Sequence, residues 1–361
     1  MYHNPSKIIF NHELIETLPL YLPKKGKVLI VTTPGFTNRG VTAQIKKALS
    51  SCQVIVHDQV SPNPDILFLE GTKEALKKYS IEWIVALGGG SVLDTAKVLS
   101  LLISSSCSVR LDQLLRSNTE VLWTDNIPII AVPTTSGTGA EVTPFATVWD
   151  SVTKKKFSLS DERLYSNLVL LDPSLSLTLP KQETLYTALD TVSHALESLW
   201  NKNKTPISQA YAIEALSLAT ETLPELINNL SSLSLRRKMQ HASLLAGMAI
   251  SQTQTALAHS ISYPLTLHYG VPHGLACSFS LAAIGELIQV NNFSSRKKEI
   301  IYDSLALLDK LPLIEHLLRF TTLSKIEEKV PEMITSNRSD NFIFQVNSSI
   351  IKRVLSIALR D

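Results

Sequence analysis

The stretch "EWIVALGGGSVLDTAKVLSLLI", residues 82–103, decides the fold. It begins as a short apolar run, typical of a buried strand, and this run ends in three consecutive glycines. The residues from Ser91 onward have the periodicity of a helix. A strand that passes through a glycine turn into a helix is the building unit of a parallel α/β sheet.

Similar units surround this one. Short apolar runs predict further strands, and helix-period segments lie between several of them. Alternation of this kind implies a mainly parallel sheet covered by helices. The predicted strands lie at 27–33, 52–58, 127–135, 146–150, 155–160 and 167–173, and the helices at 41–49 and 65–79.

The second half of the chain has a different character. After Pro180, long helix-period segments follow with few strand signals. We therefore predict an α/β domain over residues 1–178 and an all-α domain over residues 179–361, with ligands in the cleft between them. The predicted helices lie at 181–200, 207–229, 233–252, 274–290 and 297–308.

Composition narrows the function. Of the 361 residues, 44% are hydrophobic and 18% are charged, and the net charge is +2, so nothing favours binding to nucleic acid or to an anionic membrane. Three scattered cysteines argue against a disulfide framework. No apolar run approaches the ~20 residues that span a bilayer. We expect a soluble, cytoplasmic protein without nucleic-acid or membrane partners.

Two loops are candidates for nucleotide binding. In "LGGGSVLDTAK" (87–97), glycines let the backbone approach a diphosphate, and the helix N-terminus supplies N–H groups. In "PTTSGTGAEVT" (133–143), hydroxyls and glycines offer donors to a ribose or phosphate. Each is weak evidence alone, because tight turns and polar surface loops have similar compositions. Together, at the ends of neighbouring strands, they indicate a ligand site of an open α/β sheet.

Four residues form a candidate metal site. Asp190 and His194 are four apart in a helical segment, so both side chains leave the same face. His259 and His273 are the candidates for the other half. One carboxylate and up to three imidazoles suit Fe²⁺ or Zn²⁺ and leave a position for a substrate oxygen. Each residue alone is more often an ordinary core or surface group.

The motifs together carry a family resemblance. The GGGSxxDxAK run, the PTTSGTGAEVT run, DxxxH and the His-x13-His-Gly pattern occur in an order and spacing that resembles the iron-containing (group III) alcohol dehydrogenases. The resemblance covers nearly the whole chain, including "SPNPD" at 61–65. It implies a Rossmann-like N-terminal dinucleotide domain and an all-α metal-binding domain, the fold shared with dehydroquinate synthase. It also implies a catalytic Fe²⁺, or alternatively Zn²⁺, and hydride transfer between a nicotinamide and an aldehyde. A homodimer is the expected assembly.

The resemblance also implies which residues form the sites. Carried over by position, the metal ligands are Asp190, His194, His259 and His273. The implied cofactor-binding residues are Thr33, Asn63, Gly89, Gly90, Ser91, Asp94, Thr134, Thr135, Ser136 and Lys156.

Two positions depart from the family pattern. Many members carry an acidic residue after the first strand, which hydrogen-bonds the ribose 2′-hydroxyl. This chain has Thr33 there and Arg39 nearby, so we expect NADPH to be favoured over NADH. Many members also have a histidine four residues after the third metal ligand, where this chain has Tyr263. The Tyr263 hydroxyl is a candidate proton donor, with a packing role as the alternative. His268 is a candidate partner for a metal ligand.

The segment "HSISYPLTLHYGVPHGLACSFS", residues 259–280, resembles the phosphonoacetaldehyde reductase branch of the family, which forms 2-hydroxyethylphosphonate. A phosphonate needs basic partners. Arg163, Arg236 and Arg237 are available, although a surface charge is the expected role of each. The alternatives are a group III dehydrogenase for a simple alcohol or a lactaldehyde-like substrate, a lyase of the dehydroquinate synthase type, and a non-catalytic nucleotide-binding protein.

Overall fold

The computed structural model describes residues 2–10, 13–104, 109–117, 123–288 and 295–360. The chain divides into two compact units. One, the α/β unit, comprises Asn4–Thr135 and Ala140–Ser176. The other, the helical unit, contains Leu177–Asp361, the short segment Ser136–Gly139 and the residues at the N-terminus.

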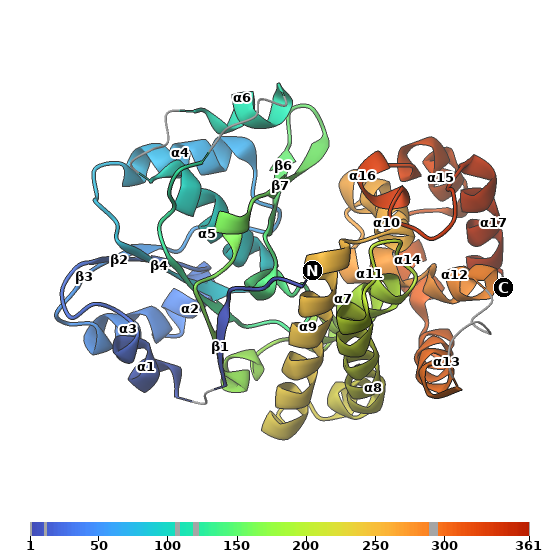
Figure 1. Ribbon diagram of the computed structural model, residues 1–361, viewed down its shortest axis with the longest axis horizontal. Coiled ribbons are helices and arrows are strands. Elements are labelled where there is room, and N and C mark those ends of the chain that lie inside the picture. Colours follow the sequence, from blue (N-terminus) through green and yellow to red (C-terminus); the bar gives the residue numbers. More distant parts are fainter. Residues whose placement is uncertain (1, 11–12, 105–108, 118–122, 289–294, 361) are drawn as a thin grey trace. The chain divides into compact units, whose positions relative to one another are not determined.

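The α/β unit is built on a six-stranded sheet in the order β1-β8-β5-β4-β2-β3, and every neighbouring pair is parallel (Figure 1). The register places Gly88 opposite Pro133, so the chain leaves β4 and β5 at the same edge of the sheet. The strands are β1 (Lys7–Phe10), β2 (Lys27–Val31), β3 (Gln53–His57), β4 (Trp83–Gly88), β5 (Ile129–Pro133) and β8 (Leu168–Leu171).

Two apolar clusters stabilise this unit. In the first, alternate residues of the central strands, such as Val28, Ile30 and Val85, pack with Ile45 and other residues of the helices that flank β2 in the chain. The second joins helices α4 to α6 to an antiparallel hairpin, β6 (Phe145–Asp150) and β7 (Lys155–Ser160). The helices are α1 (Leu14–Thr17), α2 (Pro34–Asn38), α3 (Val41–Ala48), α4 (Ile66–Leu76), α5 (Gly90–Leu102) and α6 (Leu111–Arg116).

The helical unit packs around α7, which is buried along most of its length because residues from Thr184 to Leu199 face other helices on nearly every side. Helix α8 begins with Pro206 at its first position and a capping box between Thr205 and Ser208. The helices are α7 (Lys181–Leu199), α8 (Pro206–Asn228), α9 (Leu233–Thr253), α10 (Leu257–Tyr269), α11 (His273–Ser278), α12 (Leu281–Ile288), α13 (Ser295–Asp309), α14 (Leu313–Leu318), α15 (Leu323–Glu328), α16 (Ser336–Ser339) and α17 (Ser348–Ala358).

The predicted fold class, a parallel α/β sheet followed by an all-α part, is confirmed. The single helix predicted over 274–290 is wrong, since α11 ends at Ser278 and α12 begins at Leu281. The last two residues of that predicted helix, and Cys107, lie outside the described residues. Within the described ranges, no helix is both long and apolar enough to cross a membrane.

Candidate metal centre

Helix α7 presents three acidic and imidazole side chains on one face. Asp190, His194 and Glu197 are spaced by four and three residues, which places them along one stripe of the helix. All three are nearly inaccessible to solvent, with exposed fractions of 3%, 4% and 0%. Buried ionisable groups are costly unless they are paired or bind a metal, so this stripe indicates a functional site.

Helices α10 and α11 bring two further histidines to the same place. His259 lies in the first turn of α10, and His273 is the first residue of α11. The residue after it, Gly274, packs directly on α7, because an added Cβ would overlap the carbonyl oxygen of Tyr186. Only glycine permits this close approach, and the contact therefore fixes where His273 stands relative to Asp190.

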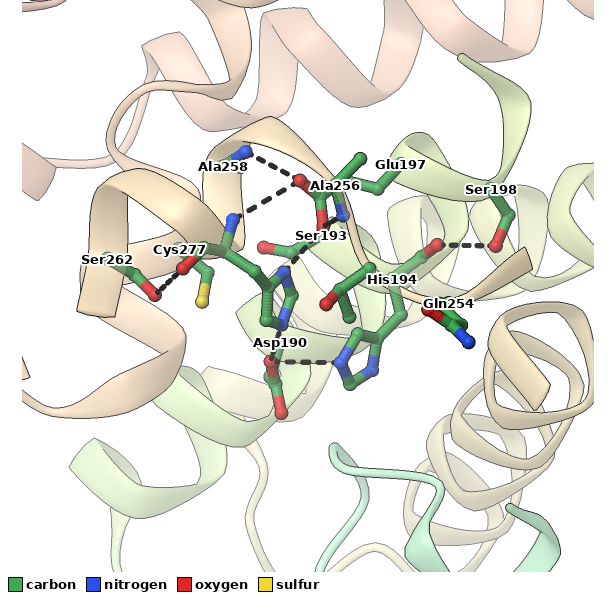
Figure 2. Close-up of polar contacts among 12 residues, drawn as sticks. Asp190, Ser193, His194, Glu197, Ser198, Gln254, Ala256, Ala258, Ser262 and Cys277 are labelled. Atoms are coloured by element: carbon green, nitrogen blue, oxygen red, sulfur yellow. Dashed lines mark hydrogen bonds and ion pairs between the residues drawn. The ribbon is translucent and has the colours of Figure 1, made fainter. Parts of the chain in front are cut away.

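The four predicted ligands converge. Asp190 Oδ1 lies 3.5 Å from His194 Nε2, 3.6 Å from His259 Nε2 and 3.8 Å from His273 Nε2. Ligands placed about 2.0–2.2 Å from a tetrahedral ion are separated by roughly 3.3–3.6 Å, close to these values. In Figure 2 the labelled Asp190 carboxylate faces His194, with Cys277 on the other side.

Two of the candidate ligand atoms also lack hydrogen-bond partners, which fits a metal site. Asp190 Oδ1 and His259 Nε2 are both buried and have no hydrogen-bond partner among the described residues. Unsatisfied polar atoms in a protein interior cost free energy, and two of them facing each other require an explanation. A divalent cation bound between them would satisfy both, so the residues present fit the metal that the sequence predicts.

The ring orientations favour coordination through Nε2. His259 Nδ1 lies 2.6 Å from Glu197 Oε2, and His194 Nδ1 lies 3.3 Å from the carbonyl oxygen of Gly137. Each acceptor holds the ring proton on Nδ1, which leaves the Nε2 lone pair available. Glu197 also accepts the backbone N–H groups of Ala256, Ala258 and His259, so it caps α10 as well (Figure 2).

The electrostatics keep the acidic groups ionised. Burial would raise the pKa of Asp190, but His194, His273 and His259 lower it below its usual value. Burial would likewise raise the pKa of Glu197, yet His259 and the backbone donors hold that pKa low. Burial lowers the pKa of His194. At His259, burial lowers the pKa, but Cys277, Glu197 and Asp190 raise it above its usual value, so this ring holds a proton. A metal bound here would displace that proton and leave an ionised carboxylate with neutral imidazoles.

Cys277 also lies beside these ligands, although the sequence analysis did not predict it as part of the site. Asp190, His259, His273 and Cys277 each offer an atom within 4.8 Å of the others, and Cys277 Sγ is 3.7 Å from both ring nitrogens of His273. Burial raises the pKa of the Cys277 thiol, so the thiol form is favoured. Both missed residues had a signal: Glu197 is seven residues after Asp190, and Cys277 is four after His273.

The two residues expected near the metal ligands are placed differently. Tyr263 lies one helical turn after His259 on α10, so it shares that face of the helix. His268 lies near the end of α10, and its Nε2 contacts Glu332 Oε2 at 2.6 Å in a partly exposed pair. The structure thus pairs His268 with Glu332. The role of His268 as a partner for a metal ligand remains a prediction.

Most of the residues predicted to bind the cofactor lie in the α/β unit, whereas Ser136 belongs to the helical unit. The Thr134 N–H donates to the Gly88 carbonyl oxygen at 3.1 Å, so the loops after β4 and β5 lie side by side. An added Cβ on Gly89 would lie 3.1 Å from Thr135 Oγ1. The close contact leaves a backbone edge that is bare of side chains at Gly89 and Gly90, and helix α5 begins at Gly90.

Further predicted residues join this edge. The backbone N–H of Asn63 donates to Ser91 Oγ at 3.3 Å, and Asn63 has a left-handed φ of 61°. Asp94 Oδ2 accepts the N–H of Thr147 on β6 at 2.9 Å. Burial raises the pKa of Asp94 to about 6, while Lys97 and Lys156 act in the opposite direction. Lys156 on β7 is therefore close to the helix that carries Ser91 and Asp94.

Thr33 and Arg39 lie together after β2. Thr33 is the residue before helix α2, and an added Cβ on Gly35 would lie 3.2 Å from Arg39 Nη1 and 3.8 Å from Thr33 Oγ1. The Arg39 guanidinium stacks on the Phe36 ring at 4.5 Å. No carboxylate stands at position 33, and a cation is held next to it.

The sequence of the chain matches one protein family over most of its length. Residues 5–173 match the family described as iron-containing alcohol dehydrogenase, and residues 184–308 match the C-terminal domain of the Fe-containing alcohol dehydrogenase family. The chain belongs to the iron-containing alcohol dehydrogenase family, whose members are oxidoreductases acting on alcohols and aldehydes.

Individual relatives show how varied the family's substrates are. An NAD-dependent methanol dehydrogenase from Bacillus methanolicus is 31% identical over 71% of this chain and 69% of its own. A phosphonoacetaldehyde reductase from Streptomyces viridochromogenes is 32% identical over 78% of this chain and 72% of its own. A sulfoacetaldehyde reductase from Bilophila wadsworthia is 32% identical, with the match covering 71% of this chain and 66% of the relative.

Solved structures agree on the fold. An iron-containing alcohol dehydrogenase from Thermotoga maritima aligns with a TM-score of 0.83 at 26% identity, covering 99% of each chain. A sulfoacetaldehyde reductase from Bifidobacterium kashiwanohense, solved in complex with NAD⁺, aligns with a TM-score of 0.87 at 24% identity, covering 100% of this chain and 99% of its own.

Proposed function

We propose that the protein is a metal-dependent NAD(P)H oxidoreductase that interconverts a short aldehyde and its primary alcohol, and that phosphonoacetaldehyde is a substrate. The observation that carries the metal dependence is the convergence of three imidazole Nε2 atoms on Asp190 Oδ1, a buried atom with no hydrogen-bond partner among the described residues. The phosphonoacetaldehyde and sulfoacetaldehyde reductases among the relatives support a substrate that carries an acidic group.

In the proposed reaction, Asp190, His194, His259 and His273 hold Fe²⁺ or Zn²⁺. When bound, such an ion supplies Lewis acidity toward a carbonyl oxygen. Glu197 orients the His259 ring through its 2.6 Å contact, and Gly137 does the same for His194. A nicotinamide cofactor supplies the hydride, and a proton must also reach the alcohol oxygen. We assign that proton to the Tyr263 hydroxyl, which shares a helix face with His259.

We further propose that NADPH is favoured over NADH. Position 33 carries no acidic side chain, and Arg39 stands beside it to pair with a 2′-phosphate. The Thr33→Asp variant should lose about 10- to 100-fold in kcat/KM for NADPH through charge repulsion, with little change for NADH. Equal effects on the two cofactors would contradict this assignment.

The decisive test of the activity is a substrate panel. Metal-loaded protein is assayed for NADPH and NADH oxidation with phosphonoacetaldehyde, sulfoacetaldehyde, lactaldehyde and butanal. The proposal predicts that the acidic aldehydes are reduced most efficiently. Preference for butanal or lactaldehyde would support the alternative of a simple alcohol dehydrogenase, and no turnover of any aldehyde would support a non-catalytic nucleotide-binding protein.

The proton assignment is tested separately. Tyr263→Phe should lower kcat by about 100-fold, the usual contribution of a positioned acid, while metal content stays unchanged. A variant with the full rate would remove Tyr263 from the reaction.

A further inference from the structure

The short helix α16 is anchored to the helix that carries His259. Ser260 Oγ donates to the carbonyl oxygen of Met333 at 2.6 Å and lies 2.9 Å from Thr335 Oγ1. The backbone N–H of Thr335 in turn donates to Ser260 Oγ at 3.2 Å. Because Ser260 directly follows His259, these bonds fix α16 beside the metal centre, and Figure 1 shows α16 next to α10.

Arg338 projects from α16 toward the metal-centre residues. Its guanidinium carbon lies 5.9 Å from the centroid of the Tyr263 ring. Burial lowers the pKa of the Arg338 guanidinium, while Tyr263, Cys277 and Glu197 raise it. Cys277 lies beside His273 and Glu197 beside His259, so the cation acts on groups that contact two candidate metal ligands. It stays charged because arginine does not deprotonate in proteins.

The Arg338 guanidinium has no acceptor of its own. It is partly buried, yet among the described residues no atom accepts a hydrogen bond from its side chain and no carboxylate pairs with it. Glu197, the carboxylate that acts on Arg338, already accepts from three backbone N–H groups and contacts the His259 ring. Five N–H donors held in a fixed plane without an acceptor form a site for an anion.

We propose that Arg338 binds the anionic end of the substrate, and that the substrate class is a short aldehyde with a tetrahedral oxyanion group such as a phosphonate or a sulfonate. The inference rests on the proposed function and assigns a residue to its specificity. The planar fork of the guanidinium matches two oxygens of such a group. Arg338 lies beside Tyr263, and Tyr263 is one helical turn from the candidate metal ligand His259 on α10.

Of the other arginines considered from the sequence, two make contacts of their own and the third is exposed. Arg236 is buried and donates to Leu230 O, Thr184 Oγ1 and Leu179 O, which ties together the ends of two helices. Arg163 pairs with Asp161 at 3.1 Å in the α/β unit. Arg237 is exposed on α9. The surface-charge interpretation is therefore wrong for Arg236, and Arg338 is the residue that the sequence did not single out.

A purely structural role for Arg338 makes different predictions. A cation stacked on an aromatic ring stabilises a fold by a modest amount. If this were its only role, its removal would lower stability and affect charged and neutral aldehydes equally. Binding of an oxyanion instead predicts a loss confined to anionic substrates, partly restored by lysine, which keeps the charge but not the fork.

The test compares Arg338→Met and Arg338→Lys with Arg237→Met as the matched control. Each metal-loaded protein is assayed with phosphonoacetaldehyde, sulfoacetaldehyde and neutral butanal. Ethylphosphonate and ethanesulfonate, which lack a carbonyl, are tested as inhibitors of butanal reduction. We expect Arg338→Met to lose about 100- to 1,000-fold in kcat/KM for the anionic aldehydes and all inhibition by the two anions, with butanal changed less than about threefold. Arg338→Lys should recover part of the loss, and Arg237→Met should match the wild type.

The outcomes separate the two proposals. The ratio of the phosphonate and sulfonate effects identifies which oxyanion the site prefers. If the wild type reduces anionic aldehydes and Arg338→Met does so equally well, the assignment of Arg338 is overturned while the proposed function stands. If the wild type reduces only neutral aldehydes and neither anion inhibits it, both the anionic substrate and the role of Arg338 are refuted.

Discussion

Replacing Glu197 with glutamine should weaken metal binding without touching a ligand. Oε1 of Glu197 accepts the backbone N–H groups of Ala258 and His259, and Oε2 accepts Ala256 N–H and faces His259 Nδ1 at 2.6 Å. Glutamine replaces one of these oxygens with an NH₂ group. In either orientation, therefore, the amide donors face two N–H donors.

The magnitude follows from these contacts. Each buried hydrogen bond whose acceptor is exchanged for a second donor costs about 1–3 kcal/mol of free energy. The part of this cost that falls on the His259 ring appears as weaker metal binding, and partners of this kind contribute about 10- to 100-fold to metal affinity. We expect a loss in this range for Glu197→Gln.

Competition with a chromophoric chelator measures the affinity, and circular dichroism of the metal-free protein verifies the fold. Glu332→Gln is the matched control, because Glu332 also lies 2.6 Å from a histidine nitrogen, that of His268, in a partly exposed pair. It should leave the affinity unchanged. A folded Glu197→Gln protein with wild-type metal affinity would refute the reasoning.

Two further predictions concern packing and pH. Gly274→Ala should place a methyl group against the carbonyl oxygen of Tyr186, displace His273 and reduce both metal content and stability, by roughly 1–3 kcal/mol in chemical denaturation; an unchanged denaturation midpoint would contradict this. Burial raises the pKa of Glu141 to about 7 from 4.5, so the native state holds a proton that the unfolded state releases above 4.5. The contribution of Glu141 to stability should therefore fall by about 2–3 kcal/mol as the pH rises from 4.5 to 7. Glu141→Gln should flatten this slope in urea unfolding, and a slope equal to that of the wild type would show that Glu141 is not its source.

The sheet was predictable because its signals are local. The run through residues 82–103 became β4 and α5, and the strand predicted over 155–160 is β7 with the same bounds. The edge strand β1 was not predicted, because its four residues, Lys7–Phe10, become a strand only by pairing with β8 far along the chain. Helix α10, which starts at Leu257, was not predicted either; Glu197, far earlier in the chain, caps its first N–H groups.

The site was predictable only in part, because only some of its residues are close together in the sequence. Asp190 and His194 share one helix, so their spacing reveals that they act together. Their association with His259 and His273 rested on family resemblance, because no local pattern connects separate helices. Arg338 was not predicted at all, because only the fold brings α16 to α10.

The most direct test of the account is the metal content of protein purified without air, measured by elemental mass spectrometry for the wild type and for His259→Ala. The Nε2 atoms of His194, His259 and His273 each lie within 3.8 Å of Asp190 Oδ1, so we predict about one Fe or Zn per chain in the wild type. The variant should contain almost none and should not reduce aldehydes. A wild type without metal that still turns over, or a His259→Ala protein that retains both metal and activity, would contradict the central claim.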